Sequence, residues 1–223
     1  MKLKLLACRI WLLGTLGVGS LAVGTVRADP APSLKSNDLA HGPYSSMHML
    51  LEKTFLKVDV LTVDVRFGKS AHARLAKLAR GKAYSEALGK EAAKIAIAAD
   101  DALVQLHFVR DVSLDQWMDG VRENLQQARD AGLISKKTQQ RVGQGLPSWF
   151  APLAERGYSE GDRVLYRVRP DSLRTVVVTA GGKILVDRRD RDKDALRVVM
   201  ASYFAPGSDF REPLLRSLFK PSH

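Results

Sequence analysis

The segment TFLKVDVLTVDVRF, residues 54–67, is the strongest strand signal in the chain. It alternates apolar residues, half of them valine, with polar ones, which is typical of a strand with one buried face. The alternation changes phase partway, because Val58 and Val60 share one parity while Leu61 and Val63 share the other. Successive side chains of a strand point to opposite faces, so either a bulge resets the phase near Val60 or the strand is buried on both sides.

Two charged residues of this segment are candidates for a site. Without a bulge, Lys57 and Asp59 point the same way as Leu61 and Val63. A cation and a carboxylate would then lie at the mouth of an apolar face. A carboxylate beside an apolar surface can have a raised pKa and serve as a general base. Asp59 is therefore the candidate catalytic residue if the protein is an enzyme.

Helical and strand patterns alternate along the rest of the chain. Long strands in both halves, with helices between them, favour an α+β fold over a parallel α/β sheet. A helix within 135–157 is expected to fray at Gly143 and Gly145 and to halt around Pro147 and Pro152. The run RRDRDKD, 188–194, predicts a solvated connection. The other predicted elements are helices over 70–80, 84–99, 113–131 and 195–204, a last helix ending at Phe219, and strands over 102–110, 162–170, 172–180 and 183–187.

The helix over 113–131 carries the most informative polar residue. Ser113, with Gln116 three residues later, predicts an N-cap and a capping box. Trp117 and Asn124 fall on one otherwise apolar stripe of this helix. A buried amide without partners costs about 1–3 kcal/mol. Asn124 is therefore either paired with neighbours at the boundary of the core or part of a site, and the residues alone leave both open.

The first 28 residues predict a signal peptide. MKLK gives a positive start, WLLGTLGVGSLAVGTV an apolar stretch, and Val26-Arg27-Ala28 small residues where a signal peptidase cleaves. Residues 29–45, rich in proline and serine, predict a flexible leader, and 46–223 the folded domain. The protein is therefore expected to be exported, to the periplasm or beyond the cell.

The cysteine content and the net charge limit the disulfides and the classes of binding partner that the chain can have. Cys8, the only cysteine, lies in the predicted signal, so the domain is expected to stand on its core without disulfides. The formal net charge of +11 could favour anionic membrane surfaces, and export argues against nucleic acid. The basic stripe between Lys69 and Lys82 could touch lipid headgroups. Its apolar partners are mostly alanine, which favours a solvated face.

No metal or nucleophile signature stands out. The histidines are scattered, with no pair at helical ligand spacing, so no metal or other cofactor is expected. Met47-His48-Met49 offers ligands that suit copper, but ordinary packing is the favoured interpretation of so short a pattern. The chain has no nucleophile elbow, no candidate catalytic thiol and no glycine-rich phosphate loop.

The order of these elements resembles the chalcone isomerase-like family, and in particular its exported bacterial members. The resemblance covers roughly residues 46–219. It implies an open-faced β-sandwich, in which a layer of helices covers a mainly antiparallel sheet. The segments that carry it are TFLKVDVLTVDVRF for the long first strand, LHFVRDVSLDQWMDGVRENL for the second strand and the site-bearing helix, GYSEGDRVLYRVRPDSLRTVVVTAGGKILVD for the meander, and ALRVVMASYFAPGSDFREPLLRSLF for the last two helices.

The resemblance also assigns site positions. The family's tyrosine falls on Trp117, its asparagine on Asn124 and its serine or threonine on Ser202. The strand threonine falls on Asp59, and the arginine that stabilises the oxyanion falls near Met47. Losing that cation removes a stabilisation of several kcal/mol, and a carboxylate has the wrong sign to replace it. Isomerase activity on chalcones is therefore not expected.

The leading hypothesis is a non-catalytic domain that binds a hydrophobic or amphipathic, fatty-acid-like molecule in the cleft between sheet and helices. Trp117 would line the cleft, Asn124 and Ser202 would offer hydrogen bonds, and Lys57 or Asp59 would set the polarity at its mouth. One alternative is an isomerase or intramolecular lyase with an altered substrate and Asp59 as its base. Another is a structural or interaction protein of the envelope with a basic face. The domain is expected to be a monomer.

Overall fold

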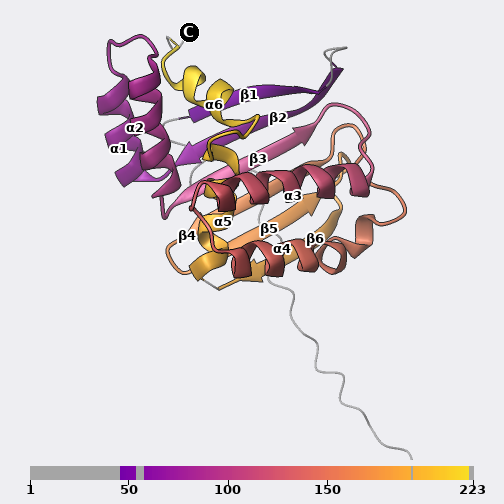
Figure 1. Cartoon of the computed structure of the whole chain (residues 1–223). Coiled ribbons are helices and arrows are strands. Elements are labelled where there is room, and N and C mark those ends of the chain that lie inside the picture. The colour runs from indigo at the N-terminus through magenta and orange to yellow at the C-terminus, as the bar shows by residue number, and fades with distance from the viewer. Residues whose placement is uncertain (1–45, 54–57, 192, 221–223) are drawn as a thin grey trace, which may run out of the picture. The chain divides into compact units, whose positions relative to one another are not determined.

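Six antiparallel strands form one sheet in the order in which they follow one another along the chain (Figure 1). The computed structural model describes residues 46–53, 58–191 and 193–220. The predicted signal peptide and leader, 1–45, lie outside the described residues. The strands are β1 (Ser46–Lys53), β2 (Val58–Phe67), β3 (Ala102–Phe108), β4 (Arg163–Arg169), β5 (Ser172–Val178) and β6 (Ile184–Asp190).

The pairing of β1 with β2 contains a bulge, which was one of the two explanations of the phase change. Leu51 pairs with Leu61, and the next pair is Glu52 with Asp59. Val60 is therefore the extra residue of β2, and the alternation restarts there. With the bulge in place, periodicity no longer argues that residues 57 and 59 share a face with the buried residues that follow.

β1 is the strand that the sequence periodicity missed. Of the segment 54–67, residues 58–67 form β2, and residues 54–57 lie outside the described residues. The segment SMHMLLEK has no β-branched residue, so it lacks the usual strand signal. Met47 and Met49 of β1 are buried in the core, whereas His48 lies on the other face with its Nδ1 2.8 Å from a carboxylate oxygen of Asp64. The three side chains of Met-His-Met therefore do not converge on one ligand.

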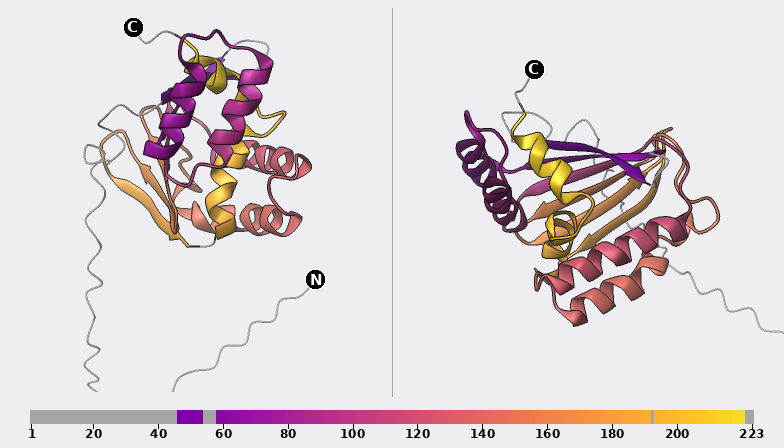
Figure 2. Two further views of the ribbon diagram at one scale, coloured as in Figure 1. Left: turned by 90° about the vertical axis from the view of Figure 1, so that its left-hand side faces the viewer. Right: turned by 45° about the horizontal axis from the view of Figure 1, so that its top comes forward.

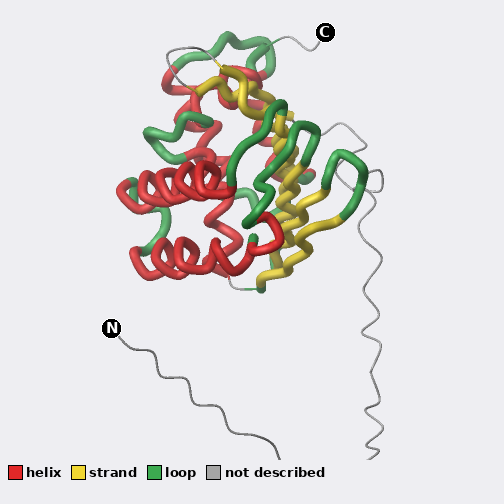
Figure 3. The backbone as a smooth tube through the Cα atoms, turned by 90° about the vertical axis from the view of Figure 1, so that its right-hand side faces the viewer, coloured by secondary structure: helices red, strands yellow, loops and turns green. Residues whose placement is uncertain are grey.

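Helices lie on one side of the sheet (Figures 2 and 3). The central helix, α5, packs against α2, α3 and α4 and also contacts β4 and β5. Its Met200 and Phe204 are wholly buried, as expected from the sequence. This layer confirms the predicted α+β architecture with an open-faced sheet. The helices are α1 (Lys69–Ala79), α2 (Glu86–Ile97), α3 (Leu114–Asp130), α4 (Lys136–Trp149), α5 (Lys193–Phe204) and α6 (Arg211–Leu218), with a 3₁₀ turn η1 (Ala151–Leu153).

The two faces of the sheet differ in what covers them. On the helix side, Val63, Phe67 and Phe108 are fully buried in the main core. The opposite face carries a smaller apolar cluster, which consists of Leu103, Leu165, Val176 and Val178. Within the described ranges, no helix is long and apolar enough to cross a membrane.

The predicted end of the fourth helix, around Pro147 and Pro152, is confirmed, whereas the fraying predicted at Gly143 and Gly145 is not observed. α4 continues through Gly143, Gly145 and Pro147 and ends at Trp149. A proline removes one N–H and crowds the carbonyl four residues earlier. Pro147 lies in the last turn of α4, and the residue four positions earlier is Gly143, so the helix loses a single hydrogen bond and still completes its turn.

The charge run 188–194 is not a solvated connection throughout. β6 extends to Asp190 and stays paired with β5, with Arg188 opposite Thr175 and Asp190 opposite Leu173. The alternation of β6 therefore brings Arg188 and Asp190 to the same face as buried Val186. This correction matters because that face looks towards the helices.

Candidate functional site

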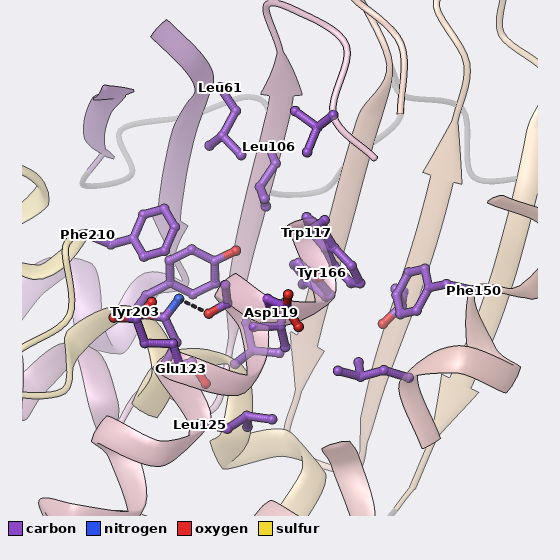
Figure 4. Close-up of a pocket in the computed structure, with 18 of the residues that line it drawn as sticks. Leu61, Leu106, Trp117, Asp119, Glu123, Leu125, Phe150, Tyr166, Tyr203 and Phe210 are labelled. Atoms are coloured by element: carbon purple, nitrogen blue, oxygen red, sulfur yellow. Dashed lines mark hydrogen bonds between the residues drawn. The ribbon is translucent and has the colours of Figure 1, made fainter. Parts of the chain in front are cut away.

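A pocket of about 560 Å³ lies between the sheet and helices α3, α4 and α5 (Figure 4). Every strand contributes to its lining, from Leu51 of β1 to Asp190 of β6. Neighbouring strands lie about 4.8 Å apart, so the lined part of the sheet is about 24 Å wide. Small-molecule sites have volumes of about 300–1,000 Å³ and are mostly apolar. The pocket therefore has the size and shape for an elongated apolar ligand.

The start of α3 positions the aromatic wall of the pocket. The Ser113 hydroxyl accepts a hydrogen bond from the Gln116 amide, and the Gln116 side chain accepts one from the Ser113 amide, each at 3.2 Å. This capping box, predicted from the sequence, fixes the first turn. The helix then brings Trp117 against Phe150, the residue that follows α4, with ring centroids 4.5 Å apart. Trp117 is 7% exposed and lines the pocket.

Asn124 lies two turns further along α3 and joins two parts of the protein. Its side-chain amide donates to the Gly120 carbonyl at 2.9 Å, and its oxygen accepts a hydrogen bond from the Ser208 hydroxyl at 3.1 Å. Asn124 is therefore paired with neighbours at the boundary of the core, which is one of the two roles that the sequence left open. It also lines the pocket, as does Ser202 of α5, so the structure brings Trp117, Asn124 and Ser202 to one cavity.

The other predicted site residues are not placed. Lys57 lies outside the described residues, and so does the side chain of Asp59. The general-base alternative and the predicted polarity of the mouth therefore stay predictions. Met47, near which the arginine position of the resemblance falls, is 0% exposed and is not among the residues that line the pocket.

The pocket is also lined by two tyrosines that the sequence did not single out as site residues. Tyr166 of β4 and Tyr203 of α5 have no hydrogen-bond partner for their hydroxyls among the described residues. Burial raises the pKa of both hydroxyls, and the nearby Tyr166 adds a smaller upward effect on the pKa of Tyr203. Tyr166 alternates with Val164 and Val168 along β4, so strand parity could have placed it on the core face.

The cationic side chain of Arg188 also faces the pocket. It belongs to the part of β6 that the sequence predicted to be a solvated connection. The Arg188 guanidinium lies 4.0 Å above the ring centroid of Trp149 and 3.2 Å from a carboxylate oxygen of Asp190. All three residues line the pocket. Stacking on an indole and pairing with a carboxylate both stabilise a guanidinium. Continued alternation from Val186 was the sequence signal for this inward-facing pair.

The rim of the pocket is acidic. Asp119 and Glu123 lie on the same side of α3 (Figure 4). Five charged residues of the lining are exposed, and four of them are carboxylates: Arg110, Asp111, Asp119, Glu123 and Asp209. This sign contrasts with the strongly basic composition of the chain.

No family model and no curated protein matches the chain by sequence. The structure, in contrast, matches solved ones. A fatty-acid binding protein of Arabidopsis thaliana superposes with a TM-score of 0.52 over 79% of this chain and 86% of that one, at 12% sequence identity. The fold is chalcone isomerase-like. At this identity the match shows the fold alone, and it confirms the architecture that the sequence resemblance implied.

Proposed function

We propose that this protein binds a hydrophobic or amphipathic small molecule, with an acyl-like chain, in the pocket between its sheet and helices, and does not convert it. The observation that carries the proposal is the pocket itself. It crosses the whole sheet, and its walls combine aliphatic side chains with Trp117, Phe150 and Phe210. The fatty-acid binding protein of the same fold offers a precedent for such a ligand.

The proposal is supported by the balance of apolar and polar groups in the lining. Apolar side chains give the affinity, because burying them removes their surface from water. A few polar groups, among them Asn124 and Ser202, are available to orient the ligand. In the lining that the structure describes, no nucleophile is paired with a base as hydrolytic catalysis requires, which is why we propose binding rather than turnover.

Mass spectrometry of protein purified without denaturant tests the proposal directly. An organic extract of the wild-type protein should contain one amphiphile or a narrow class of them at a ratio near one per chain. Ser202→Trp should lose this molecule, because the indole fills the pocket. Ser70→Trp, on exposed α1, is the matched control and should keep it. Empty wild-type protein that also fails to bind any apolar dye would refute the proposal.

We further propose export of the protein, for which the three-part pattern of residues 1–28 is the support. N-terminal sequencing of protein from the periplasm or medium should begin at Asp29. Recovery of the intact N-terminus from the cytoplasm alone would contradict it. Contact of the basic α1 with anionic membranes and the monomeric state stay predictions.

A further inference from the structure

The charges around the pocket do not suit an anionic ligand. Across the described lining, five carboxylates face two arginines, which makes the lining negative by three charges. The whole chain, in contrast, carries +11. One of the carboxylates, Asp119, is 2.8 Å from Arg122, which is outside the lining. Even so, an approaching carboxylate would meet a rim of its own sign, and like charges repel.

Neither arginine of the lining offers a cation to the interior. Arg188 is already paired with the Asp190 carboxylate, and its guanidinium lies over the Trp149 ring. A ligand carboxylate next to this pair would meet no net charge. Arg110 is exposed and belongs to the rim. A buried carboxylate without a cation of its own loses its hydration and gains little in exchange.

Two other polar groups inside the pocket are, by contrast, uncharged. Tyr203 is only 8% exposed, yet its hydroxyl has no partner among the described residues, and the same holds for the hydroxyl of Tyr166. Neither hydroxyl is completely enclosed by protein atoms, so both can reach the void. Buried hydroxyls are normally hydrogen-bonded. The buried hydroxyl of Tyr203 and that of the half-buried Tyr166 both lie beside an apolar cavity, which indicates a ligand atom that completes them.

We infer that the ligand carries an uncharged hydrogen-bonding group, such as a hydroxyl or a carbonyl, bound by Tyr166 and Tyr203, and that free carboxylates are disfavoured. This inference rests on the proposed function and names its ligand class. A hydroxyl or carbonyl can exchange hydrogen bonds with two tyrosines without bringing a charge into the pocket. The apolar remainder of the ligand would extend along the sheet towards Trp117 and Phe150.

Competition between two dodecyl compounds tests the inference. Dodecanol and dodecanoate have the same chain, and each can displace Nile red, an uncharged dye, from the wild-type protein. At pH 8 the Kd of dodecanol should be lower by about tenfold, equivalent to about 1.4 kcal/mol. The difference should shrink below pH 5, where the carboxyl group of dodecanoate takes up a proton.

Single substitutions test the role of the tyrosine hydroxyls and that of the acidic rim separately. Tyr203→Phe keeps the ring and removes the hydroxyl, so dodecanol should bind roughly three- to tenfold more weakly, whereas Tyr84→Phe, outside the pocket, should change nothing. Glu123→Gln should improve dodecanoate binding by about twofold, because an exposed charge is partly screened. Glu91→Gln removes the same charge from exposed α2 and should not.

The outcomes are distinct. Dodecanoate binding as tightly as dodecanol at pH 8, or Tyr203→Phe and Tyr166→Phe both binding dodecanol like the wild type, would overturn the inference while leaving the proposed function standing. Failure of Nile red and of both dodecyl compounds to bind would instead overturn the proposed function, and the inference with it.

Discussion

Two groups of polar side chains lie inside this protein, and only one of them is supplied with partners by the fold. Asp162, just before β4, is 1% exposed and accepts hydrogen bonds from Arg156 at 2.8 Å and from the backbone amides of Ser159 and Ala180 at 2.9 and 3.1 Å. The hydroxyls of Tyr166 and Tyr203 have none among the described residues.

The difference between Asp162 and the two tyrosines shows how buried polar groups that stabilise the fold can be told from groups available to a ligand. Around Asp162, where the chain closes on itself, both carboxylate oxygens accept hydrogen bonds and the group holds loops together. Where the helices leave a cavity, hydroxyls remain available. Leaving a buried polar group unpaired costs about 1–3 kcal/mol, so such groups persist where a ligand or solvent can complete them.

Asp162→Ala should lower the free energy of unfolding by roughly 3 kcal/mol, because it removes a buried acceptor and leaves two backbone amides and Arg156 without it. Urea unfolding followed by circular dichroism measures the change. Affinity for Nile red per folded molecule should be unaltered, because Asp162 does not line the pocket.

Asp162→Asn is the matched control. It keeps one oxygen acceptor in place, so it should cost less than the alanine variant. Equal stability of Asp162→Ala and the wild type would show that the hydrogen bonds of Asp162 do not stabilise these loops. The contrast between this paired group and the unpaired hydroxyls of the pocket would then have no energetic basis.

Alkaline pH should lower the free energy of unfolding through the hydroxyls of Tyr166 and Tyr203. Burial raises the pKa of Tyr166 and Tyr203 in the folded protein, so both stay neutral in either state below a pH of about 10. As the pH rises further, the unfolded chain releases these protons first, and each tyrosine lowers the free energy of unfolding by about 1.4 kcal/mol per pH unit. Stability is thus fully present below pH 10 and falls above it.

The double variant with Tyr166→Phe and Tyr203→Phe checks this effect, because phenylalanine does not titrate. Its unfolding free energy should fall less steeply above pH 10, by about 2.7 kcal/mol per pH unit, than that of the wild type. Tyr84→Phe is the control. Identical slopes for the wild type and the double variant would mean that the two hydroxyls ionise as readily in the folded protein as in the unfolded chain.

Asn124 belongs to both groups, since it lines the pocket and is paired. Asn124→Ala should cost about 1–2 kcal/mol, because the buried Ser208 hydroxyl loses its acceptor. A double-mutant cycle with Ser208→Ala tests the cause. If the pair carries the effect, the two losses should not add. Additive losses would place the role of Asn124 in ligand contact rather than in this bond.

Local chemistry made part of this structure predictable. Ser113 and Gln116 define the start of α3 without help from the rest of the fold. The change of parity near Val60 left a bulge or burial on both faces as explanations, and the structure contains the bulge. β1 was missed because methionine and leucine carry no strand preference. The end of β6 was missed because Arg188 faces inward only where Trp149 of another element is present to receive it.

The site was predictable to a similar degree. Trp117, Asn124 and Ser202 were expected to share a cleft from the family resemblance, and all three line the pocket. Tyr166 and Tyr203 were not singled out. Parity shows that a side chain points into the core, but only the packing of α3 and α5 over the sheet decides whether its hydroxyl meets protein or a void.

Tyr158→Phe should have the smallest effect and is the sharpest test of the contrast. Tyr158 is 0% exposed, its ring stacks on Phe108 at 4.2 Å, and its hydroxyl has no partner among the described residues. Unlike Tyr203, it does not line the pocket. Phenylalanine keeps the stack and removes only the unpaired hydroxyl, so urea unfolding should show a change between zero and a gain of about 1 kcal/mol. Ligand affinity should not move. A loss of stability larger than about 1 kcal/mol would reveal a buried water bound to this hydroxyl, and an unpaired hydroxyl would then no longer distinguish the pocket from the closed core.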